Sequence, residues 1–382
     1  MSGVVEKRPS KLPNVGTTIF TTMSALAAEH GAINLAQGFP DFPIDPILQE
    51  QLLIVSRENV HQYAPLQGLP TLREKICGLL AKQYNRKVGI GDVLITAGAT
   101  QAIFTIIQAL VFPGEEVIIL DPSYDCYDAP VQLAGAHAVR IPLKETFEPD
   151  WNLIEAHTTE QTKLLIINNP HNPSGRVWND SDFQALERLM ERFPKLLLLS
   201  DEVYEFIAYE KGHQSINQRK AIIDRTIIVS SFGKTFHITG WKIGYLVCEG
   251  YLMNEILKVH QFLVFCVNSV AQAALANYLD LVDVNLLGPF YQQKRDFFRA
   301  GLEDSRFELL PSEGSYFQVA KFTKISAKSD VEFCRDLTIN HGVAAIPISV
   351  FNADVKDQGL IRFCFAKTSE TLQQAIEKLC KI

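Results

Sequence analysis

The stretch TIIVSSFGKTFHITGWKIGYLV, residues 226–247, decides the fold class, because two short apolar runs enclose a polar loop that contains glycine. The runs, 226–229 and 243–247, have the length of strands and are apolar on both faces. That pattern is typical of strands buried between two layers of helices. The loop between them carries Lys234 and Lys242, so charged side chains follow directly on a buried strand.

The same alternation of buried strands and helices extends outward from this stretch. Two segments between apolar runs have helical periodicity, 100–111 and 181–192, and the second follows Asn179-Asp180, a typical N-cap pair. Four further apolar runs of strand length lie upstream, at 93–96, 117–120, 164–167 and 196–199. Strands that alternate with helices predict an α/β fold whose mostly parallel sheet is covered by helices on both faces.

The sequence changes character near residue 290. Beyond this point the patterns predict helices at 291–302, 331–341 and 370–379, short segments at 308–310 and 316–319, and a strand at 360–366. This is typical of a smaller α+β domain. We therefore expect three parts: an N-terminal arm with part of the small domain (1–45), a large domain (46–289) and a C-terminal small domain (290–382).

Composition excludes several classes of protein. The 382 residues include 36 Lys and Arg against 43 Asp and Glu, a net charge of −7 that disfavours nucleic acid and anionic membranes as partners. An apolar fraction of 47% argues against disorder. No apolar run approaches the ~18 residues of a membrane span, and no secretory signal is visible. The seven cysteines are scattered, and the nine histidines lack zinc-site spacing, so we expect a cytoplasmic protein without a metal site.

Two of the loops that follow apolar runs offer hydrogen-bond donors. In TAGATQAIF, Gly98 and Ala99 let the backbone approach a ligand, and Thr100 opens a helix whose free N–H groups can bind phosphate. In NNPHNPSG, two X-Pro steps and a glycine fix a turn from which Asn172 can present its amide. An ordinary turn without a ligand remains the alternative for each loop.

Two further loops supply charge. SDEVY places Asp201 at the sheet edge, where a buried carboxylate needs a cation, and Tyr204 can reach the same place. In SSFGKTFHITGWKIGY, Lys234 has apolar surroundings that lower the pKa of a lysine and make it a nucleophile for a carbonyl. The alternatives are a solvated loop carboxylate and a surface lysine.

Two nucleotide-binding motifs are incomplete in this sequence. The GKT string would need glycine at position 228 to form a phosphate-binding P-loop, and that residue is Ile228. The GxGxxG pattern starting at Gly89 has Leu94 in place of its third glycine and precedes a strand, which weakens a nicotinamide-enzyme alternative. The four loops together instead match pyridoxal 5′-phosphate, which needs a lysine, a carboxylate, phenolic-oxygen donors and a phosphate nest.

At this point the sequence resembles the fold-type I pyridoxal-phosphate enzymes of the aspartate aminotransferase superfamily. Eight motifs occur in the order of that family: INLAQGFPDF, QYAPLQG, TAGATQA, DPSYDCY, NNPHNPSG, SDEVY, SFGKTFHITGWKIGY and IRFCF. The chain is most similar to the kynurenine and methionine aminotransferase branch. Its motifs SFGKTFHITGWKIGY, EGSYF and HGVAAIPISVF resemble those of the bacterial methionine aminotransferases in that branch. The resemblance implies that residues 46–289 form the cofactor-binding domain.

The resemblance also implies roles for individual residues. Lys234 would bind the cofactor aldehyde and shuttle the proton, and Asp201 would pair with the pyridinium nitrogen. The remaining cofactor contacts would come from Tyr204 and Asn172 at the phenolic oxygen, Tyr124 on the ring face, and Gly98, Ala99, Thr100, Ser231 and Lys242 at the phosphate. Substrate would be bound by Arg362, Gly38, Asn172 and Phe20, and Tyr63 would reach the neighbouring subunit's cofactor in a homodimer.

The implied activity is transfer of an amino group to a 2-oxo acid. Lys242 replaces the arginine of aspartate aminotransferases, as is usual in the kynurenine-type branch. Phe20 and Phe39 lie in segments that line the side-chain pocket of that branch, which favours methionine and aromatic donors over dicarboxylates. The alternatives are a kynurenine–oxoglutarate transaminase, a cysteine-conjugate β-lyase, and a non-catalytic cofactor-binding regulator, which the short N-terminal extension and the negative charge disfavour.

Overall fold

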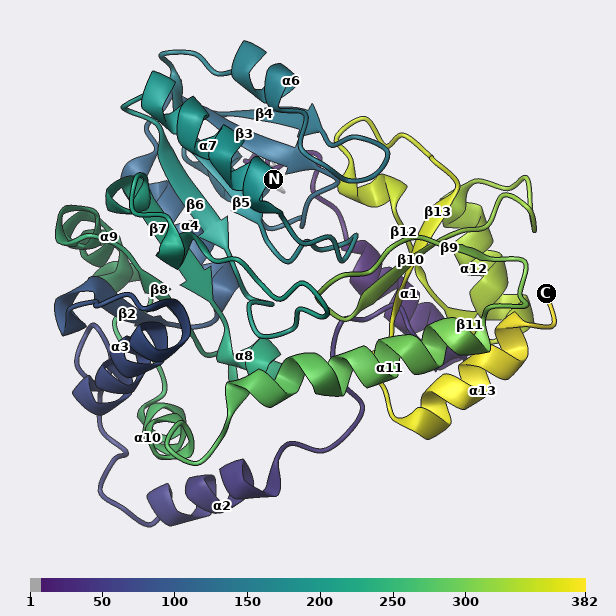
Figure 1. Cartoon of the computed structure of the whole chain (residues 1–382), viewed down its shortest axis with the longest axis horizontal. Coiled ribbons are helices and arrows are strands. Elements are labelled where there is room, and N and C mark those ends of the chain that lie inside the picture. Colours follow the sequence, from purple (N-terminus) through teal and green to yellow (C-terminus); the bar gives the residue numbers. More distant parts are fainter. Residues whose placement is uncertain (1–7) are drawn as a thin grey trace, which may run out of the picture.

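The large sheet forms the centre of the molecule in the computed structural model, which describes residues 8–382 (Figure 1). Its seven strands lie in the order β2-β8-β7-β6-β5-β3-β4. Their bounds are β2 Val93–Thr96, β3 Glu116–Asp121, β4 His137–Pro142, β5 Thr162–Asn168, β6 Leu197–Asp201, β7 Thr226–Ser230 and β8 Gly244–Val247. All six apolar runs identified in the sequence are therefore strands of one sheet.

The sheet is mostly parallel, which confirms the expected fold class. Neighbours from β4 to β7 pair in parallel, whereas β8 is antiparallel to both β7 and β2. Sequence patterning missed β4, because this edge strand is half exposed and lacks the continuous apolar run of a central strand. The strands β2, β3, β5, β6 and β7 all end at the same side of the sheet, next to the small domain.

Helices cover both faces of the large sheet. Successive residues of strand β5 point to opposite faces of the sheet. Leu164 and Ile166 pack against one layer of helices, and Leu165 and Ile167 pack against the other. The first layer contains α4 (Ala99–Leu110), α5 (Asp128–Leu133) and α9 (Gly250–Leu263). The second contains α6 (Trp151–Ala156) and α7 (Asp180–Arg192) on one half of the sheet, with α2 (Pro46–Val55), α3 (Pro70–Tyr84) and α10 (Ser269–Tyr278) on the other.

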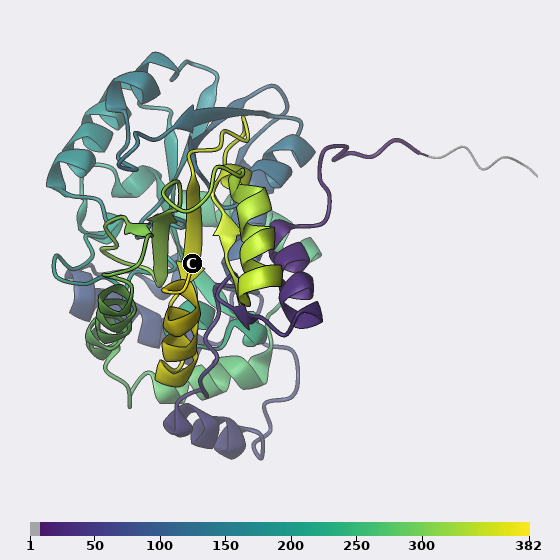
Figure 2. The ribbon, with the colours of Figure 1, turned by 90° about the vertical axis from the view of Figure 1, so that its right-hand side faces the viewer.

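A separate, smaller sheet lies beyond the strand ends (Figures 1 and 2). It is antiparallel, in the order β12-β13-β10-β9, with bounds Ile346–Pro347, Leu360–Cys364, Phe317–Lys321 and Glu308–Leu309. Strands β1 (Ile33–Asn34) and β11 (Val343–Ala344) form a separate, parallel two-stranded sheet that attaches the N-terminal segment to the C-terminal part of the chain. The surrounding helices are α1 (Ile19–Glu29), α11 (Leu287–Gly301), α12 (Asp330–His341) and α13 (Ser369–Leu379).

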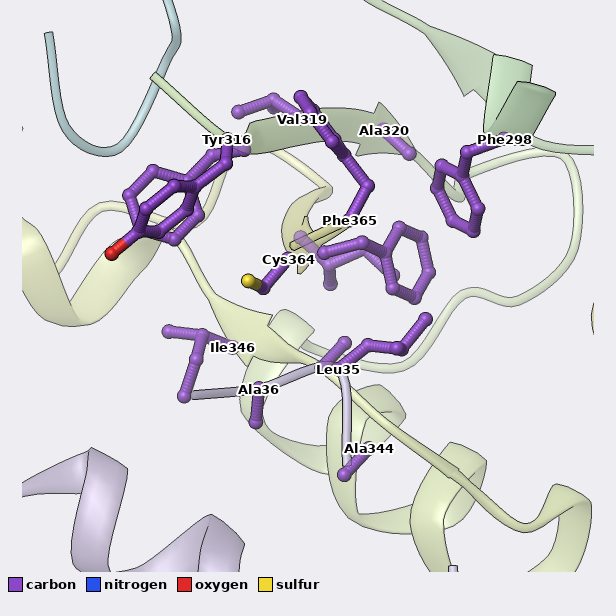
Figure 3. Packing of buried hydrophobic residues seen from close by; sticks show 14 of the residues in the cluster. Leu35, Ala36, Phe298, Tyr316, Val319, Ala320, Ala344, Ile346, Cys364 and Phe365 are labelled. Atoms are coloured by element: carbon purple, nitrogen blue, oxygen red, sulfur yellow. The ribbon is translucent and has the colours of Figure 1, made fainter. Parts of the chain in front are cut away.

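The small-domain core draws on segments far apart in the sequence. Leu35 and Ala36 from the N-terminal segment pack beside Phe365 near the C-terminus (Figure 3). Helix α11 runs from the side of the large sheet to the small sheet, so the predicted boundary at residue 290 lies within this helix (Figure 1). The domain limits stay predictions. No helix among residues 8–382 is long and apolar enough to cross a membrane.

Candidate active site

A cavity of about 480 Å³ lies where the strand ends of the large sheet face the small domain. Its walls bring together nearly all of the residues that the sequence analysis selected. These are Phe20, Gly38, Phe39, Gly98, Ala99, Thr100, Tyr124, Asn172, Asp201, Tyr204, Ser231, Lys234, Lys242 and Arg362. Within residues 8–382, no three His, Cys, Asp or Glu side chains are grouped so that they could hold a metal ion.

Lys234 extends into this cavity from the short helix α8 (Phe232–Thr235), directly after β7. Its Nζ atom donates to the Gly38 carbonyl oxygen at 3.2 Å and to the Tyr316 hydroxyl at 3.1 Å. Burial lowers the pKa of Lys234 to about 8, and the Arg362 guanidinium contributes to the lowering. At pH 7 about a tenth of the molecules then carry a neutral amine, far more than at the ordinary lysine pKa of 10.5, and this neutral form can act as a nucleophile or a base.

Asp201, at the end of β6, is a carboxylate that is only 4% exposed. Its Oδ2 atom accepts a hydrogen bond from the Tyr127 hydroxyl at 2.7 Å, and its Oδ1 atom accepts one from the Val203 amide at 3.3 Å. Burial raises the pKa of Asp201 to about 6 despite these two donors. Tyr127 was not among the residues selected from the sequence, although it is the last residue of the motif DPSYDCY and lies three residues after Tyr124.

A nest of donors lies at the N-terminus of helix α4. Gly98 is the N-cap, with φ of +80° and no side chain to occupy the first free N–H groups of the helix. A Cβ atom at this position would lie 3.5 Å from Lys242 Nζ, so the ammonium group lies directly over the helix start. Ser231 also lines the cavity. Backbone N–H groups, a hydroxyl and an ammonium group together favour an anion such as phosphate.

Arg362 lies on β13 at the opposite side of the cavity and is 1% exposed. Its Nη1 atom donates to Asn172 Oδ1 at 2.6 Å and its Nη2 atom to the Ala36 carbonyl oxygen at 3.1 Å. The guanidinium carbon lies 3.9 Å from the centre of the Phe317 ring, and Nε has no hydrogen-bond partner within residues 8–382. Unused N–H groups on a buried, fixed guanidinium are suited to a carboxylate ligand.

Aromatic rings form most of the remaining wall. Tyr124 meets Phe20 edge to face with ring centres 6.4 Å apart, and Tyr204 meets Tyr316 in the same way at 5.1 Å. Burial raises the pKa of both Tyr124 and Tyr204, so their hydroxyl groups stay protonated and can donate hydrogen bonds. The wall therefore offers ring faces and hydroxyl donors.

One residue selected from the sequence lies elsewhere. Tyr63 is 83% exposed and contacts the Phe265 ring on the surface, with ring centres 5.4 Å apart. It does not line the cavity of its own chain. Its expected contact with a second subunit stays a prediction.

The residues present fit the cofactor expected from the sequence. Asp201 makes no ion pair within the described chain, and its raised pKa is the state of a buried carboxylate that lacks a cation. A protonated ring nitrogen supplies such a cation. The neutral amine of Lys234 suits an aldehyde, and the donors at Gly98 suit a phosphate. Together these three sites match the three functional ends of pyridoxal 5′-phosphate.

Comparison with known proteins shows the family to which the chain belongs. The profile of the family described as aminotransferase class I and II matches residues 30–379. Methionine aminotransferase of Escherichia coli is 47% identical over 97% of both chains. Kynurenine–oxoglutarate transaminase 3 of Homo sapiens is 32% identical over 96% of this chain and 88% of its own.

Solved structures extend the likeness to the fold. The crystal structure of an Escherichia coli protein with methionine aminotransferase function covers 99% of this chain and 100% of its own, with a TM-score of 0.96 at 46% identity. A mutant aspartate aminotransferase of Thermus thermophilus covers 98% and 99%, with a TM-score of 0.90 at 26% identity. The chain therefore belongs to the class I and II aminotransferase family, whose members are pyridoxal-phosphate-dependent transaminases of fold type I.

Proposed function

We propose that this enzyme binds pyridoxal 5′-phosphate through Lys234 and transfers the amino group of methionine and of aromatic amino acids to 2-oxo acids. One observation carries the proposal. The lysine amine, the Asp201 carboxylate and the Arg362 guanidinium line a single cavity of about 480 Å³, each from a different part of the chain. That volume is suited to a cofactor together with a small amino acid.

Each end of the cofactor has its own set of residues in this proposal. Asp201 keeps a proton on the ring nitrogen, and the Tyr127 hydroxyl orients the carboxylate for that task. Tyr204 and Asn172 would donate hydrogen bonds to the phenolic oxygen, and the Tyr124 ring would lie against the cofactor ring. The phosphate is held by Gly98, Ala99, Thr100, Ser231 and Lys242. When bound, the cofactor supplies an electron sink for the negative charge left at the substrate Cα.

The substrate is held from the other side of the cavity. Arg362 binds the α-carboxylate, assisted by the Asn172 amide and by backbone at Gly38, which fixes the position of Cα. Lys234 then takes the proton from Cα, a task for which a lowered pKa is an advantage. General base catalysis of this kind contributes roughly 10²–10⁴-fold to the rate.

The side-chain pocket supports the choice of methionine and aromatic donors. Phe20 and Phe39 line it, and among the described residues of this chain Arg362 is the one arginine in the lining. The 47% identity to methionine aminotransferase of Escherichia coli supports the same choice. The 32% identity to human kynurenine–oxoglutarate transaminase 3 favours kynurenine as a second candidate donor, and β-lyase activity on cysteine conjugates is the third alternative.

We further propose a cytoplasmic homodimer, with domain limits near residues 45 and 289, in which Tyr63 reaches the phosphate of the partner subunit's cofactor. Fold-type I enzymes are typically dimers. Support comes from the exposed rings of Tyr63 and Phe265, which contact each other, and from Phe262, an exposed ring three residues before Phe265 in the sequence. Seven free thiols, which a reducing compartment maintains, support the location.

Two experiments test the proposed function. Reduction with borohydride followed by peptide mapping is expected to find the cofactor on Lys234, and an unlabelled Lys234 would overturn the assignment. A panel of amino donors against several 2-oxo acids is expected to rank methionine and aromatic donors above aspartate and glutamate. If pyruvate and ammonia form from a cysteine conjugate without any oxo acid, the β-lyase alternative gains instead.

A further inference from the structure

The Lys234 amine is fixed by a hydroxyl group that the sequence analysis did not select. Lys234 Nζ lies 3.1 Å from the Tyr316 hydroxyl and 3.2 Å from the Gly38 carbonyl oxygen. The Tyr316 hydroxyl itself donates to the same Gly38 oxygen at 2.7 Å. The three polar groups therefore form a closed triangle, and Lys234 is the donor in both of its contacts.

The consequence follows from the number of hydrogens on the amine. A neutral lysine amine has two N–H bonds and one lone pair. When both N–H bonds are directed at Tyr316 and Gly38, the lone pair must point away from them. We propose that Tyr316 is a positioning residue that, together with the Gly38 carbonyl, directs the lone pair of Lys234 into the cavity. This inference rests on the proposed role of Lys234.

The chain holds Tyr316 in place from several directions. The residue is fully buried, and its ring packs in the small-domain core while its hydroxyl points out of that cluster (Figure 3). A Cβ atom at Gly38 would lie 2.7 Å from Phe317 Cζ and 3.4 Å from Tyr316 Cε2, so the close approach of these segments requires glycine. Burial raises the pKa of Tyr316, which keeps the hydroxyl protonated and able to donate.

The residue before Tyr316 adopts a conformation that is rare for a side chain other than glycine. Ser315 has φ of +60°, is fully buried, and donates its backbone N–H to the Ile207 carbonyl oxygen at 2.7 Å. Its own carbonyl oxygen accepts a hydrogen bond from the Tyr209 hydroxyl. A strained residue that its surroundings hold in this way is typical of a segment whose direction matters for function.

The lone pair is the reactive part of Lys234 in both of its proposed tasks. To capture the cofactor aldehyde, it forms a carbon–nitrogen bond, and the aldehyde oxygen leaves as water with both amine hydrogens. To act as a base, it accepts the proton of the substrate Cα, while the bonding pair stays on that carbon. A rotated amine is slower in both tasks, although the substrate carboxylate still binds to Arg362.

The test compares Tyr316→Phe with Tyr291→Phe. Tyr291 is a matched control, because it is fully buried, its ring lies 5.6 Å from that of Tyr316, and its hydroxyl has no partner within residues 8–382. In Tyr316→Phe we expect kcat to fall about 10- to 100-fold, with KM for the amino donor changed less than about twofold. Tyr291→Phe should keep both values.

A second readout does not depend on turnover. The full-length apoenzyme is mixed with pyridoxal 5′-phosphate, and the rate of covalent capture is followed by visible absorbance. We expect capture by Tyr316→Phe to be about 10-fold slower or more, and capture by Tyr291→Phe to be unchanged. Equal melting temperatures would establish that both variants fold.

The outcomes separate this inference from the proposed function. If Tyr316→Phe captures the cofactor and turns over at the parent rate while Lys234→Ala is inactive, the positioning role is wrong and the proposed function stands. If the effect of Tyr316→Phe lies in KM, or if Tyr291→Phe is equally impaired, the positioning role is also wrong. If Lys234→Ala retains turnover, the proposed function itself fails.

Discussion

The two walls of the cavity are built in different ways. The first wall, defined by Thr100, Asn172, Asp201 and Lys234, comes from strand ends of the large sheet and from the segments that directly follow them. The second wall, defined by Phe20, Gly38, Phe317 and Arg362, comes from the N-terminal segment and the small sheet. In the first wall one sheet aligns all the loops, whereas in the second wall three distant parts of the chain must pack together first.

This difference divides the chemistry of the site. The first wall contains the groups that suit a fixed cofactor, which are a lysine, a buried carboxylate and a phosphate nest. The second wall contains a guanidinium and aromatic rings, which suit the carboxylate and side chain of a substrate that comes and goes. Substitutions of Asp201 and Lys234 in the first wall should therefore reduce chemistry and cofactor binding, and substitutions of Arg362 in the second wall should reduce substrate affinity.

The largest expected effect is that of Lys234→Ala in the first wall. Without the amine, neither covalent capture of the cofactor nor removal of the Cα proton is possible, so turnover should fall by at least about 10⁴-fold. Steady-state transamination and the visible spectrum of the holoenzyme measure the two losses. A variant with parent-like turnover would show that the first wall does not carry the chemistry.

Arg362→Lys tests the second wall. Lysine keeps the positive charge but loses the planar fork, so two charge-assisted hydrogen bonds to the α-carboxylate cannot both form. We expect kcat/KM for amino donors to fall about 100-fold, mainly through KM. Cofactor affinity, measured by absorbance titration, should stay within about twofold. A loss confined to kcat would erase the proposed division between the walls.

The same division explains what the sequence predicted. The residues of the first wall follow apolar runs, and because parallel strands end at one edge, reading those loops found Asp201, Asn172 and Lys234. Arg362 and Gly38 were identified only through family resemblance, because no local pattern says which distant segments meet. Tyr316 was missed for this reason: its hydroxyl reaches Gly38, which lies far away in sequence.

Strand direction also lay beyond the sequence pattern. The run at 243–247 is mostly apolar, like the runs that form β2 and β7, yet β8 is antiparallel to both of these strands. A continuous apolar run indicates that both faces of a strand are buried, but it does not indicate whether the strand is parallel or antiparallel to its neighbours. Tyr127 was missed for a related reason, since a tyrosine beside a buried strand end is more often packing than a hydrogen-bond donor to a carboxylate.

Tyr127→Phe is expected to have a smaller effect in the first wall. Asp201 would lose its 2.7 Å donor, and its pKa would rise further, which weakens its hold on a protonated ring nitrogen. We expect kcat to fall about 10-fold and the cofactor to dissociate more readily. Tyr278→Phe is the matched control, because that buried hydroxyl donates to Asp45 at 2.8 Å, outside the cavity. Equal effects of the two substitutions would contradict the role of Tyr127.

The smallest expected effect is a gain in stability. In the cofactor-free protein the native pKa of Asp201 is about 6 against an unfolded value of 3.8, so the native state retains a proton that the unfolded state has lost. The contribution of Asp201 to the free energy of unfolding is therefore fully present below about pH 4, and it is lost as the pH rises through about 6. The cofactor-free Asp201→Asn variant has no titratable group at this position, so its free energy of unfolding does not fall with pH for this reason. It should exceed the parent by about 1–3 kcal/mol in free energy of unfolding at pH 7.

The pH dependence of that difference is the sharper measurement. The Asp201 charge raises the pKa of Lys234, which is about 8, so Lys234 stays largely protonated between pH 4 and pH 6 and subtracting the two unfolding curves in that range isolates Asp201. The advantage of Asp201→Asn should grow from about pH 4 to about pH 6. Adding the cofactor should reverse it, because a protonated ring nitrogen gives the parent carboxylate the cation that it lacks. An advantage that ignores both pH and cofactor would show that Asp201 is an ordinary structural carboxylate, and the first wall would then have no charged site prepared for a ligand.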